Sequence, residues 1–485
     1  MTGMTDTIAA IATGMNQGGI GVIRVSGNNA ILAVDKIFIP KRNGKEINKL
    51  DSYTAAYGNI VNPIDNDIID EVIVLVMKAP HTYTKEDVVE IDCHGGMQVM
   101  RDILHLLINL NNIISKEVNN NRLNNNNVED ELLRVRLAKP GEFTERAFLN
   151  GRIDLSQAES VMDLISAKSE IAAKTALSQL KGNLKNKITD IRKELIHNIA
   201  FIESALDDPE HYSLDGFSDK LKDILNDKLN SIDHLIETAD NGKMMKEGIR
   251  TVILGKPNAG KSSILNVLTG KDRAIVTDVA GTTRDTLEEF VSINGIPLNI
   301  IDTAGIRETD DVVEKIGVDK SLSAMEEADL ILYIIDSSVP LDQNDIQIME
   351  KIKDRQVIIL SNKSDLDNVI NEKDIRKYLD SKIIEISAKE QSGFETFYEE
   401  LNNLFFKGRL SYNDEIYITN ERHKAALVSS AVSIKNAITS IDDGMPEDFY
   451  TIDLMSAYEQ LGFIIGESVE DDLVDTIFRE FCMGK

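Results

Sequence analysis

The first part of the chain alternates short apolar runs with amphipathic segments. The runs GIGVIRVSG (Gly19–Gly27) and EVIVLVMKAP (Glu71–Pro80) predict strands, and Gly96–Leu110 has the three- and four-residue spacing of a helix. This mixture predicts an α+β domain over residues 1–135. An asparagine-rich stretch within it, Val118–Asp130, predicts a solvated loop.

A helical pattern follows. Apolar residues three or four positions apart share one helix face, and we expect such a face to form a bundle core through Leu177, Leu180, Leu184, Ile188, Ile191 and Leu195. Strands and helices then alternate over residues 248–408, which predicts a parallel-sheet α/β domain. Residues 409–485 are helical again, and so short a segment needs a partner for its apolar stripes.

These boundaries predict that one domain is inserted into another. Residues 136–247 and 409–485 would pack together as a helical domain that carries residues 248–408 as an insertion. The expected fold class is therefore α/β plus all-α, preceded by an α+β domain. The face Leu473, Ile477 and Phe481 would dock the last helix in the bundle and fix the chain end, FCMGK.

The bulk composition narrows the class of protein. With 485 residues, of which 42% are hydrophobic, the chain can build several cores. Its two cysteines, Cys93 and Cys482, cannot form a disulfide framework, which favours a reducing compartment. Because no stretch approaches the roughly 18 apolar residues of a membrane span and the N-terminus resembles no secretory signal, we expect a cytoplasmic protein with no membrane partner. The net charge of −28 argues against nucleic-acid binding through a broad basic face.

The strongest motif is a phosphate-binding loop. Gly255, Gly260, Lys261 and Ser262 have the P-loop spacing, and they lie between an apolar strand-like run and a helical one. Backbone N–H groups of such a loop surround phosphates. Lys261 would reach the β- and γ-phosphates, and Ser262 would ligate Mg²⁺.

Three further motifs follow in the order of a GTP-binding domain: Asp302–Gly305, Asn362–Asp365 and Ser387–Lys389. Asp302 would reach the magnesium shell, and Asp365 would accept the N1 and N2 protons of guanine, which adenine does not offer in the same way. A P-loop alone leaves ATP and GTP open. We expect the nucleotide to contact Asn258, Ala259, Gly260, Lys261, Ser262, Ser263, Thr277, Asp278, Val279, Ala280, Gly281, Thr282, Thr283, Asp302, Thr303, Ala304, Gly305, Asn362, Lys363, Asp365, Ser387, Ala388 and Lys389.

Hydrolysis needs a group that the common signalling GTPases do not use. Thr283, in a switch-like loop, is placed to complete the Mg²⁺ coordination. Ile306 stands where many signalling GTPases have a water-positioning glutamine. An isoleucine cannot orient a nucleophilic water, so another group must do so.

Over nearly its whole length the chain resembles the MnmE (TrmE) family of tRNA-modifying GTPases. The motifs are YTKEDVVEIDCHGG (Tyr83–Gly96), KPGEFTERAFLNGRIDLSQAE (Lys139–Glu159), the GTPase set and the final FCMGK. The resemblance implies a homodimer that works with the FAD-dependent partner MnmG (GidA). It implies addition of an aminomethyl or carboxymethylaminomethyl group to C5 of the wobble uridine of certain tRNAs, from a reduced folate of the methylene- or 5-formyl-tetrahydrofolate kind.

The resemblance also implies how GTP is hydrolysed. G domains would pair across the dimer, and K⁺ would supply the positive charge that an arginine finger supplies elsewhere. Its ligands would be Asn258, Thr277, Val279 and Thr282. Glu314 would position the attacking water and Arg307 would stabilise the switch, although the pattern alone favours a solvated helix charge at Glu314.

For folate, the resemblance implies Arg24, Glu90, Arg152 and Lys485, with Cys482 near the one-carbon end. A carboxylate can bind an amino-pyrimidine edge, and basic groups suit the glutamate tail. The strand pattern by itself favours an exposed edge position for Arg24. The chain departs from the family at Thr13–Asn16, at Arg152 in place of a lysine, and at Met483.

Two other interpretations remain open. Cys93 and His94 are adjacent, but successive strand residues point to opposite faces, so they are poor ligands for one metal. The GTPase motifs by themselves also fit a switch for ribosome assembly or another RNA-bound partner, without base-modification chemistry. The folate-like motifs and the chain end favour the tRNA-modifying function instead.

Overall fold

The computed structural model describes residues 6–14, 18–41, 46–113, 133–271, 289–301, 325–406, 415–467, 471–479, 481 and 484. Its contacts divide the chain into two compact units, residues 1–162 with 465–485, and residues 163–464. Each unit has its own hydrophobic clusters. No helix in the described ranges is both long and apolar enough to span a membrane.

The first unit is built on a seven-stranded sheet of order β3-β4-β5-β6-β2-β1-β7. Neighbouring strands in this sheet are antiparallel, except for β1 and β7, which are parallel. The predicted strands and helix near Gly19, Glu71 and Gly96 are confirmed. The elements are β1 (Thr7–Ile11), β2 (Ile20–Ser26), α1 (Ala30–Asp35), β3 (Phe38–Pro40), η1 (Ile47–Lys49), β4 (Thr54–Val61), β5 (Ile68–Met77), β6 (Val88–His94), α2 (Met97–Ile108) and β7 (Val135–Leu137).

Alternate residues of these strands face opposite sides of the sheet. Val72, Val74 and Val76 of β5 are buried in a cluster that also contains residues of α1 and α2, so these helices cover one face. On the other face Tyr57 of β4 is opposite Ile73 of β5, and the two are 55% and 46% exposed. One face is therefore covered by α1 and α2, whereas the other is exposed at β4 and β5 and packs against Phe143 at β1.

The end of the chain packs against helices of the first unit. Helix α17 (Asp471–Arg479) joins α4 (Glu142–Leu149) and α5 (Leu155–Ser166) in one apolar cluster. Docking of the last helix by an apolar face is confirmed, but the contacts that bury it come from α4 and α5, and Ile477 is only partly buried. The fully buried members of the cluster are Leu155, Ala158, Val474, Phe478 and Phe481.

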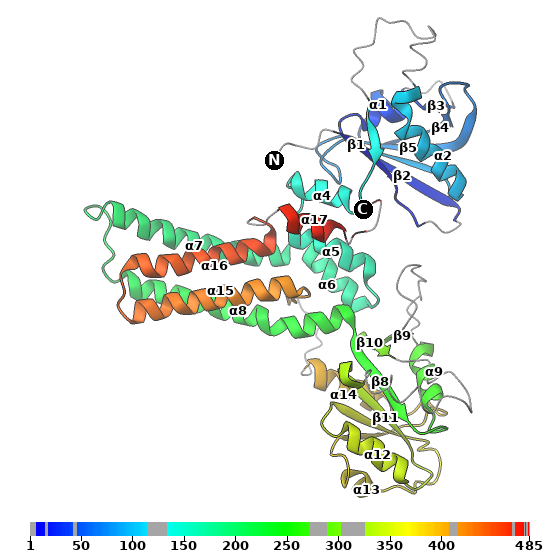
Figure 1. Ribbon diagram of the computed structural model, residues 1–485, viewed down its shortest axis with the longest axis vertical. Coiled ribbons are helices and arrows are strands. Elements are labelled where there is room, and N and C mark those ends of the chain that lie inside the picture. The colour runs from blue at the N-terminus through cyan, green and yellow to red at the C-terminus, as the bar shows by residue number, and fades with distance from the viewer. Residues whose placement is uncertain are drawn as a thin grey trace, which may run out of the picture. The chain divides into compact units, whose positions relative to one another are not determined.

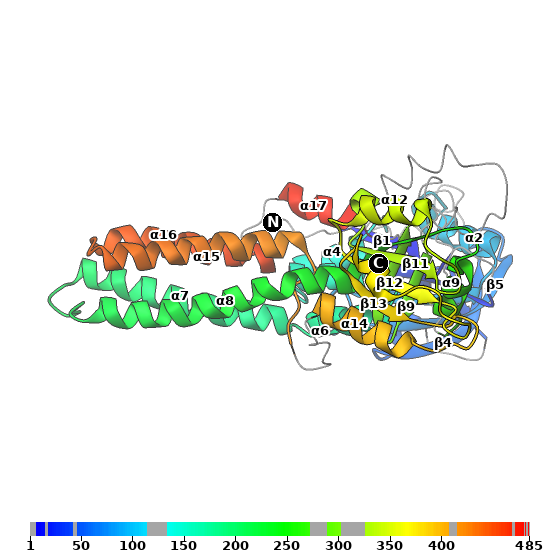
Figure 2. The ribbon, with the colours of Figure 1, turned by 90° about the horizontal axis from the view of Figure 1, so that it is seen from below.

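The second unit contains long helices that lie side by side in both views (Figure 1, Figure 2). The predicted core face is confirmed from Leu184 onward and is wrong at Leu177, which is 42% exposed. Gly182, with φ +88°, ends one helix and begins the next, so the stripe is not continuous. The long helices are α7 (Asn183–Asp207), α8 (Phe217–Glu247), α15 (Glu421–Asp442) and α16 (Glu447–Ile465), and the shorter α6 (Glu170–Leu180) precedes them.

Between α8 and α15 the chain forms a six-stranded sheet of order β13-β12-β11-β8-β10-β9. All pairs are parallel except β9 with β10. Alternate residues of β11 enter two separate apolar clusters, so both faces are buried, as is usual for a parallel sheet. The elements are β8 (Ile249–Gly255), α9 (Lys261–Lys271), β9 (Glu289–Ile293), β10 (Ile296–Ile301), β11 (Leu330–Asp336), α12 (Gln343–Ile352), β12 (Val357–Asn362), α13 (Glu372–Arg376), β13 (Lys382–Glu385) and α14 (Phe394–Phe406).

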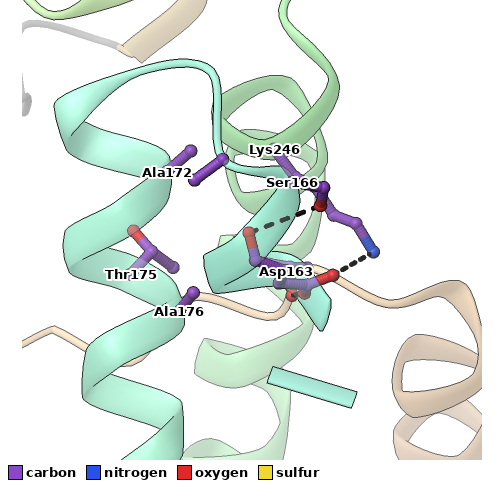
Figure 3. Close-up of a pocket in the computed structure, with 8 residues that line it drawn as sticks. Asp163, Ser166, Ala172, Thr175, Ala176 and Lys246 are labelled. Carbon is purple, nitrogen blue, oxygen red and sulfur yellow. Dashed lines mark hydrogen bonds and ion pairs between the residues drawn. The ribbon is translucent and has the colours of Figure 1, made fainter. Parts of the chain in front are cut away.

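The segment that returns from this sheet to α15 is held by hydrogen bonds. Gln179 Nε2 donates to the Tyr417 carbonyl at 2.7 Å, and the Thr419 hydroxyl donates to Asp163 at 3.2 Å. Asp163 also pairs with Lys246 at 2.9 Å, beside a small pocket that α6 lines with alanine side chains (Figure 3). The entry and exit of the α/β part are thus fixed to the helices of the same unit.

Candidate functional site

The phosphate-binding loop runs from the end of β8 to the start of α9. Gly255 has φ +152°, and a Cβ there would lie 2.5 Å from the Ile334 carbonyl oxygen. Gly260 has φ +99°, and a Cβ there would lie 2.1 Å from Asn362 Nδ2. Both positions require glycine, for backbone conformation and for close approach.

Lys261 crosses the inside of this loop. Its Nζ donates to the carbonyls of Gly255 at 2.6 Å and Lys256 at 2.9 Å, and burial lowers the pKa of its ammonium group. Asn258, with φ +63°, and Ser262 are exposed on the loop. The loop therefore combines an ammonium group, a helix N-terminus and oxygen donors, which suits phosphate with a bound cation.

Asn362 joins three of the predicted segments. Its Nδ2 donates to the Ala259 carbonyl in the P-loop at 2.9 Å, and its Oδ1 accepts from the Ala388 N–H at 3.1 Å. The side chain is buried, so these contacts lie inside the protein. The structure thus brings the P-loop, Asn362–Asp365 and Ser387–Lys389 to one edge of the sheet, at the carboxyl ends of parallel strands.

Asp365 is oriented by Ser387. The Ser387 hydroxyl donates to Asp365 Oδ1 at 2.6 Å and accepts from the Glu390 N–H at 3.1 Å. This hydrogen bond from Ser387 is the largest influence on the carboxyl group and holds the pKa of Asp365 below its ordinary value. Lys389 Nζ lies 3.8 Å away. An ionised acceptor held in this way suits the N–H edge of guanine.

Two charged groups at this edge were missed by the sequence reasoning. Asp336, the last residue of β11, pairs with Lys363 at 2.5 Å. Lys256, in the P-loop, pairs with Asp342 at 2.9 Å and Asp345 at 2.6 Å. A sequence signal was available for Asp336, which directly follows the apolar run LILYII. A residue at the end of a parallel strand lies at the same sheet edge as the motifs that end the neighbouring strands.

Part of the predicted nucleotide site and part of the predicted folate site lie outside the described residues. These positions are Thr277, Asp278, Val279, Ala280, Gly281, Thr282, Thr283, Asp302, Thr303, Ala304, Gly305, Arg307, Glu314, Cys482 and Lys485.

The first unit brings together a second group of predicted residues. Arg24 on β2 is opposite Glu90 on β6, and its Nε and Nη2 contact Glu90 Oε1 at 2.8 and 2.7 Å. Since β2 lies between β6 and β1, the expectation of an exposed edge position for Arg24 is wrong. Its Nη1 donates to the Gly484 carbonyl at 3.0 Å, so the chain end reaches this ion pair.

Gly484 explains how the chain end comes so close. It has φ +89°, and a Cβ would lie 2.4 Å from the Ile11 carbonyl oxygen at the end of β1. Only a residue without a side chain fits both the conformation and the space. Gly484 and Phe481 are therefore packed parts of the first unit.

Aromatic rings support the basic side chains on this side of the sheet. The Arg24 guanidinium lies 5.7 Å from the centre of the Phe143 ring, and that of Arg152 lies 4.8 Å from the Tyr83 ring. Arg152 also donates to the Tyr83 carbonyl at 3.0 Å. Tyr83 packs on the cluster that contains Phe143, so contacts connect Arg152 with Arg24 and Glu90.

A buried charge network holds α4, the helix that carries Phe143, and the sequence reasoning did not identify this network. Arg146 is 1% exposed and pairs with Glu142 at 3.0 Å, Asp6 at 2.9 Å and Glu86 at 3.1 Å. A buried guanidinium is tolerated only with such partners. The network ties α4 to the start of β1 and to the segment before β6.

Cys93 and His94 point to opposite sides, as predicted. Cys93 is buried and its thiol donates to the Gly21 carbonyl, whereas His94 is exposed and contacts Asp70 at 2.6 Å. Burial is the main cause that raises the pKa of Cys93 to about 11. Among the residues that the structure describes, no group of histidine, cysteine and acidic side chains could hold a metal ion.

Comparisons with known proteins cover both units. The family "GTP-binding protein TrmE N-terminus" matches residues 7–152, and the family "MnmE helical domain" matches residues 155–482. The tRNA modification GTPase MnmE of Lachnoclostridium phytofermentans is 54% identical and covers 99% of this chain and 100% of its own length. That of Clostridioides difficile is 46% identical, with 99% of each chain covered.

Among solved structures, the G domain of the T. maritima FeoB iron transporter covers 32% of this chain and 96% of its own, at 26% identity and a TM-score of 0.24. The full-length relatives and the two family matches, together with the GTP-binding motifs, identify a GTP hydrolase. The chain belongs to the MnmE family of tRNA modification GTPases.

Proposed function

We propose that this GTPase uses a reduced folate to help add an aminomethyl or carboxymethylaminomethyl group to C5 of the wobble uridine of certain tRNAs, together with an MnmG-type FAD subunit. The observation that carries the proposal is the convergence of Arg24, Glu90 and the chain end at Gly484 in a chain that also has a GTP site. A GTPase switch without modification chemistry has no need for this second site.

The residues at the second site fit a reduced folate. The Glu90 carboxylate, 23% exposed and held by Arg24, offers an acceptor to the amino-pyrimidine edge of a pterin. Arg152, exposed and stacked on Tyr83, offers a cation to the glutamate tail, as Lys485 would. The family resemblance places Cys482 near the one-carbon end, and Gly484, two residues later, accepts a hydrogen bond from Arg24. Folate supplies the one-carbon unit, and these side chains bind and orient it.

At the nucleotide, we assign Ser262 and Thr283 to Mg²⁺ and Asn258, Thr277, Val279 and Thr282 to K⁺. Asn258 and Ser262 are exposed residues, and oxygen ligands such as theirs suit hard cations. K⁺ supplies fixed positive charge beside the phosphates. Glu314 would position the water and Arg307 would stabilise the switch. The proposed domains are residues 1–135, 136–247 with 409–485, and 248–408.

We also propose a homodimer formed through the first unit. On its open sheet face Tyr57 and Ile73 are paired across β4 and β5 and are both exposed. Leu75 and Glu90 are opposite each other on β5 and β6, one row further along. Exposed apolar surface of this kind suits a partner copy, and it continues into the row that carries Arg24.

The deciding experiment measures wobble uridines by mass spectrometry. A deletion strain should lose the C5 modification, wild type should restore it, and Glu90→Gln should not. Unchanged modification in the deletion strain would reject the proposal and favour a GTPase switch. Calorimetry with 5-formyltetrahydrofolate should give heat with wild type and much less with Glu90→Gln, while GDP binding stays normal.

Potassium dependence is a separate test. GTP hydrolysis with Mg²⁺ present should rise when K⁺ replaces Na⁺, because the smaller ion does not fit the same ligand cage. Equal rates in the two salts would contradict the K⁺ assignment without affecting the folate site. Cys482→Ser should keep folate binding and GTP hydrolysis yet leave tRNA unmodified if the thiol takes part in the reaction.

A further inference from the structure

Asp336 lies at the point where two neighbouring strands end together. It is the last residue of β11, and it is in register with Asn362, the last residue of β12. Its side chain is 12% exposed. A carboxylate in this position must either be paired or lose its charge.

Both oxygens of Asp336 are engaged. Oδ1 accepts from the Ser338 N–H at 3.0 Å and from the Ser338 hydroxyl at 2.6 Å, and Oδ2 accepts from Lys363 Nζ at 2.5 Å. Burial acts to raise the pKa of Asp336, but the hydrogen bonds from Lys363 and Ser338 outweigh it and the pKa is lowered. The group therefore acts as an ionised anchor for the lysine.

The anchored lysine has an unusual backbone conformation. Lys363 has φ +66°, in the left-handed region that residues with a Cβ rarely adopt. The surrounding turn is fixed by Ser364 N–H to the Ile386 carbonyl at 3.1 Å and Leu366 N–H to the Lys363 carbonyl at 2.9 Å. Lys363 lies in the turn between Asn362, which contacts Ala259 and Ala388, and Asp365, which contacts Ser387.

We propose that Asp336 is a positioning residue for guanine recognition. By holding the Lys363 ammonium it keeps the turn at residues 362–365 in the conformation that presents Asp365 to the nucleotide and keeps Asn362 on the P-loop. The inference rests on the proposed base-binding role of this turn. The new element is Asp336 itself, which ends β11, whereas the turn that it holds follows β12.

The first test uses Asp336→Asn in the full chain. The variant keeps the size of the side chain and removes its charge. Dissociation of fluorescent mant-GDP should become about tenfold faster, since a charge-assisted hydrogen bond is weakened. The KM for GTP should rise while kcat stays near that of wild type. Asp374→Asn is the matched control, because Asp374 of α13 forms a similar pair with Lys377, at 2.7 Å, in which both side chains are exposed. Its nucleotide kinetics should be those of wild type.

A double-mutant cycle tests whether Asp336 acts through Lys363. In a Lys363→Met background, Asp336→Asn should add no further change in mant-GDP dissociation. Where Asp336→Asn alone fails to fold, Lys363→Met tests the same contact, since Lys363 is one-third exposed. Dissociation of mant-GDP at the wild-type rate in Lys363→Met would overturn the proposal. An Asp336→Asn protein that loses thermal stability but keeps wild-type nucleotide kinetics would also overturn it.

Failure of the base-binding assignment would give a different result. Asp365→Asn replaces an acceptor by an amide that can donate to the C2 carbonyl of xanthine. Its preference should shift from GDP to xanthosine diphosphate. If that shift is absent, the role of the turn is wrong. If it occurs while Asp336→Asn has wild-type kinetics, only the inference about Asp336 fails.

Discussion

One hydrogen bond is the main influence on the ionisation of the residue expected to recognise guanine. Asp365 has a pKa below its ordinary value because the Ser387 hydroxyl donates to it. A lowered pKa keeps the carboxylate ionised, and guanine bound, to a lower pH than an ordinary aspartate would. In Ser387→Ala the pKa should rise towards its ordinary value, and the acid limb of GDP binding should move to higher pH. Titrations of GDP affinity against pH measure this shift. Identical acid limbs in the two proteins would contradict it.

The pKa of the Cys93 thiol is shifted in the opposite direction, upward, mainly by burial. The thiol is buried, and its pKa of about 11 leaves on the order of one molecule in a thousand as thiolate at pH 8. A Cys482→Ser protein, which keeps Cys93 alone, should therefore resist iodoacetamide when native and react fully in guanidinium chloride. Intact-mass spectrometry follows the labelling. Rapid labelling of the native variant would show that the strand pair around Cys93 opens readily.

Sequence reasoning at this scale succeeded where a motif fixed the neighbours of a residue. The spacing of Gly255, Gly260 and Lys261 predicted the loop because glycine and lysine have few other uses in that pattern. It failed for Arg24, because strand order decides whether a charged residue is at an edge or inside, and strand order is a long-range property. Asp336 was missed although it directly follows the apolar run LILYII, because it belongs to none of the recognised motifs.

At the scale of elements, glycines determine where helices can meet. Gly141 has φ +71°, and a Cβ there would lie 2.5 Å from the Phe478 carbonyl oxygen of α17. Gly216 has φ +72°, with nothing within 4 Å of such a Cβ. An alanine at either position must adopt the left-handed backbone conformation, which costs roughly 1 kcal/mol. Only Gly141→Ala also displaces α17, so it should be the more destabilising of the two.

Chemical denaturation and limited proteolysis measure this difference. Gly141→Ala should unfold at lower denaturant and lose its last residues to protease sooner than Gly216→Ala. Equal effects of the two substitutions would mean that α17 is not held where Gly141 approaches it. Folate binding should weaken in Gly141→Ala alone, because the contact between Gly484 and Arg24 depends on the docked chain end.

Element types were predictable from periodicity, and element boundaries less so. The stripe from Leu184 to Leu195 identified a buried helix face, since several turns repeat the same spacing. The stripe could not reveal the break at Gly182, because a glycine between two helices and a glycine inside one look alike in sequence. Of the predicted docking face, Phe481 is buried and Ile477 only partly, while Val474 and Phe478 are the buried residues of α17. The pattern could not fix this face because the helices that pack against it are far away in the sequence.

At the scale of the whole molecule, the order of domains along the chain differs from their grouping in space. Residues 465–485 belong with residues 1–162, although hundreds of residues separate them. The sequence predicted an inserted α/β part from the alternation of strands and helices. It could not show that α17 packs against α4, because that contact depends on where the intervening chain returns.

Two units with separate ligands should unfold with separate responses. Binding to one folded unit stabilises that unit alone, by about 2.7 kcal/mol when the ligand is at 100 times its Kd. GDP with Mg²⁺ should therefore raise the unfolding transition of residues 163–464, and a reduced folate that of residues 1–162 with 465–485. Differential scanning calorimetry measures both transitions, and Lys261→Ala is the control that should lose the GDP response and keep the folate response. If either ligand raises both transitions equally, the units unfold as one cooperative body, and the contacts within each unit do not determine its stability.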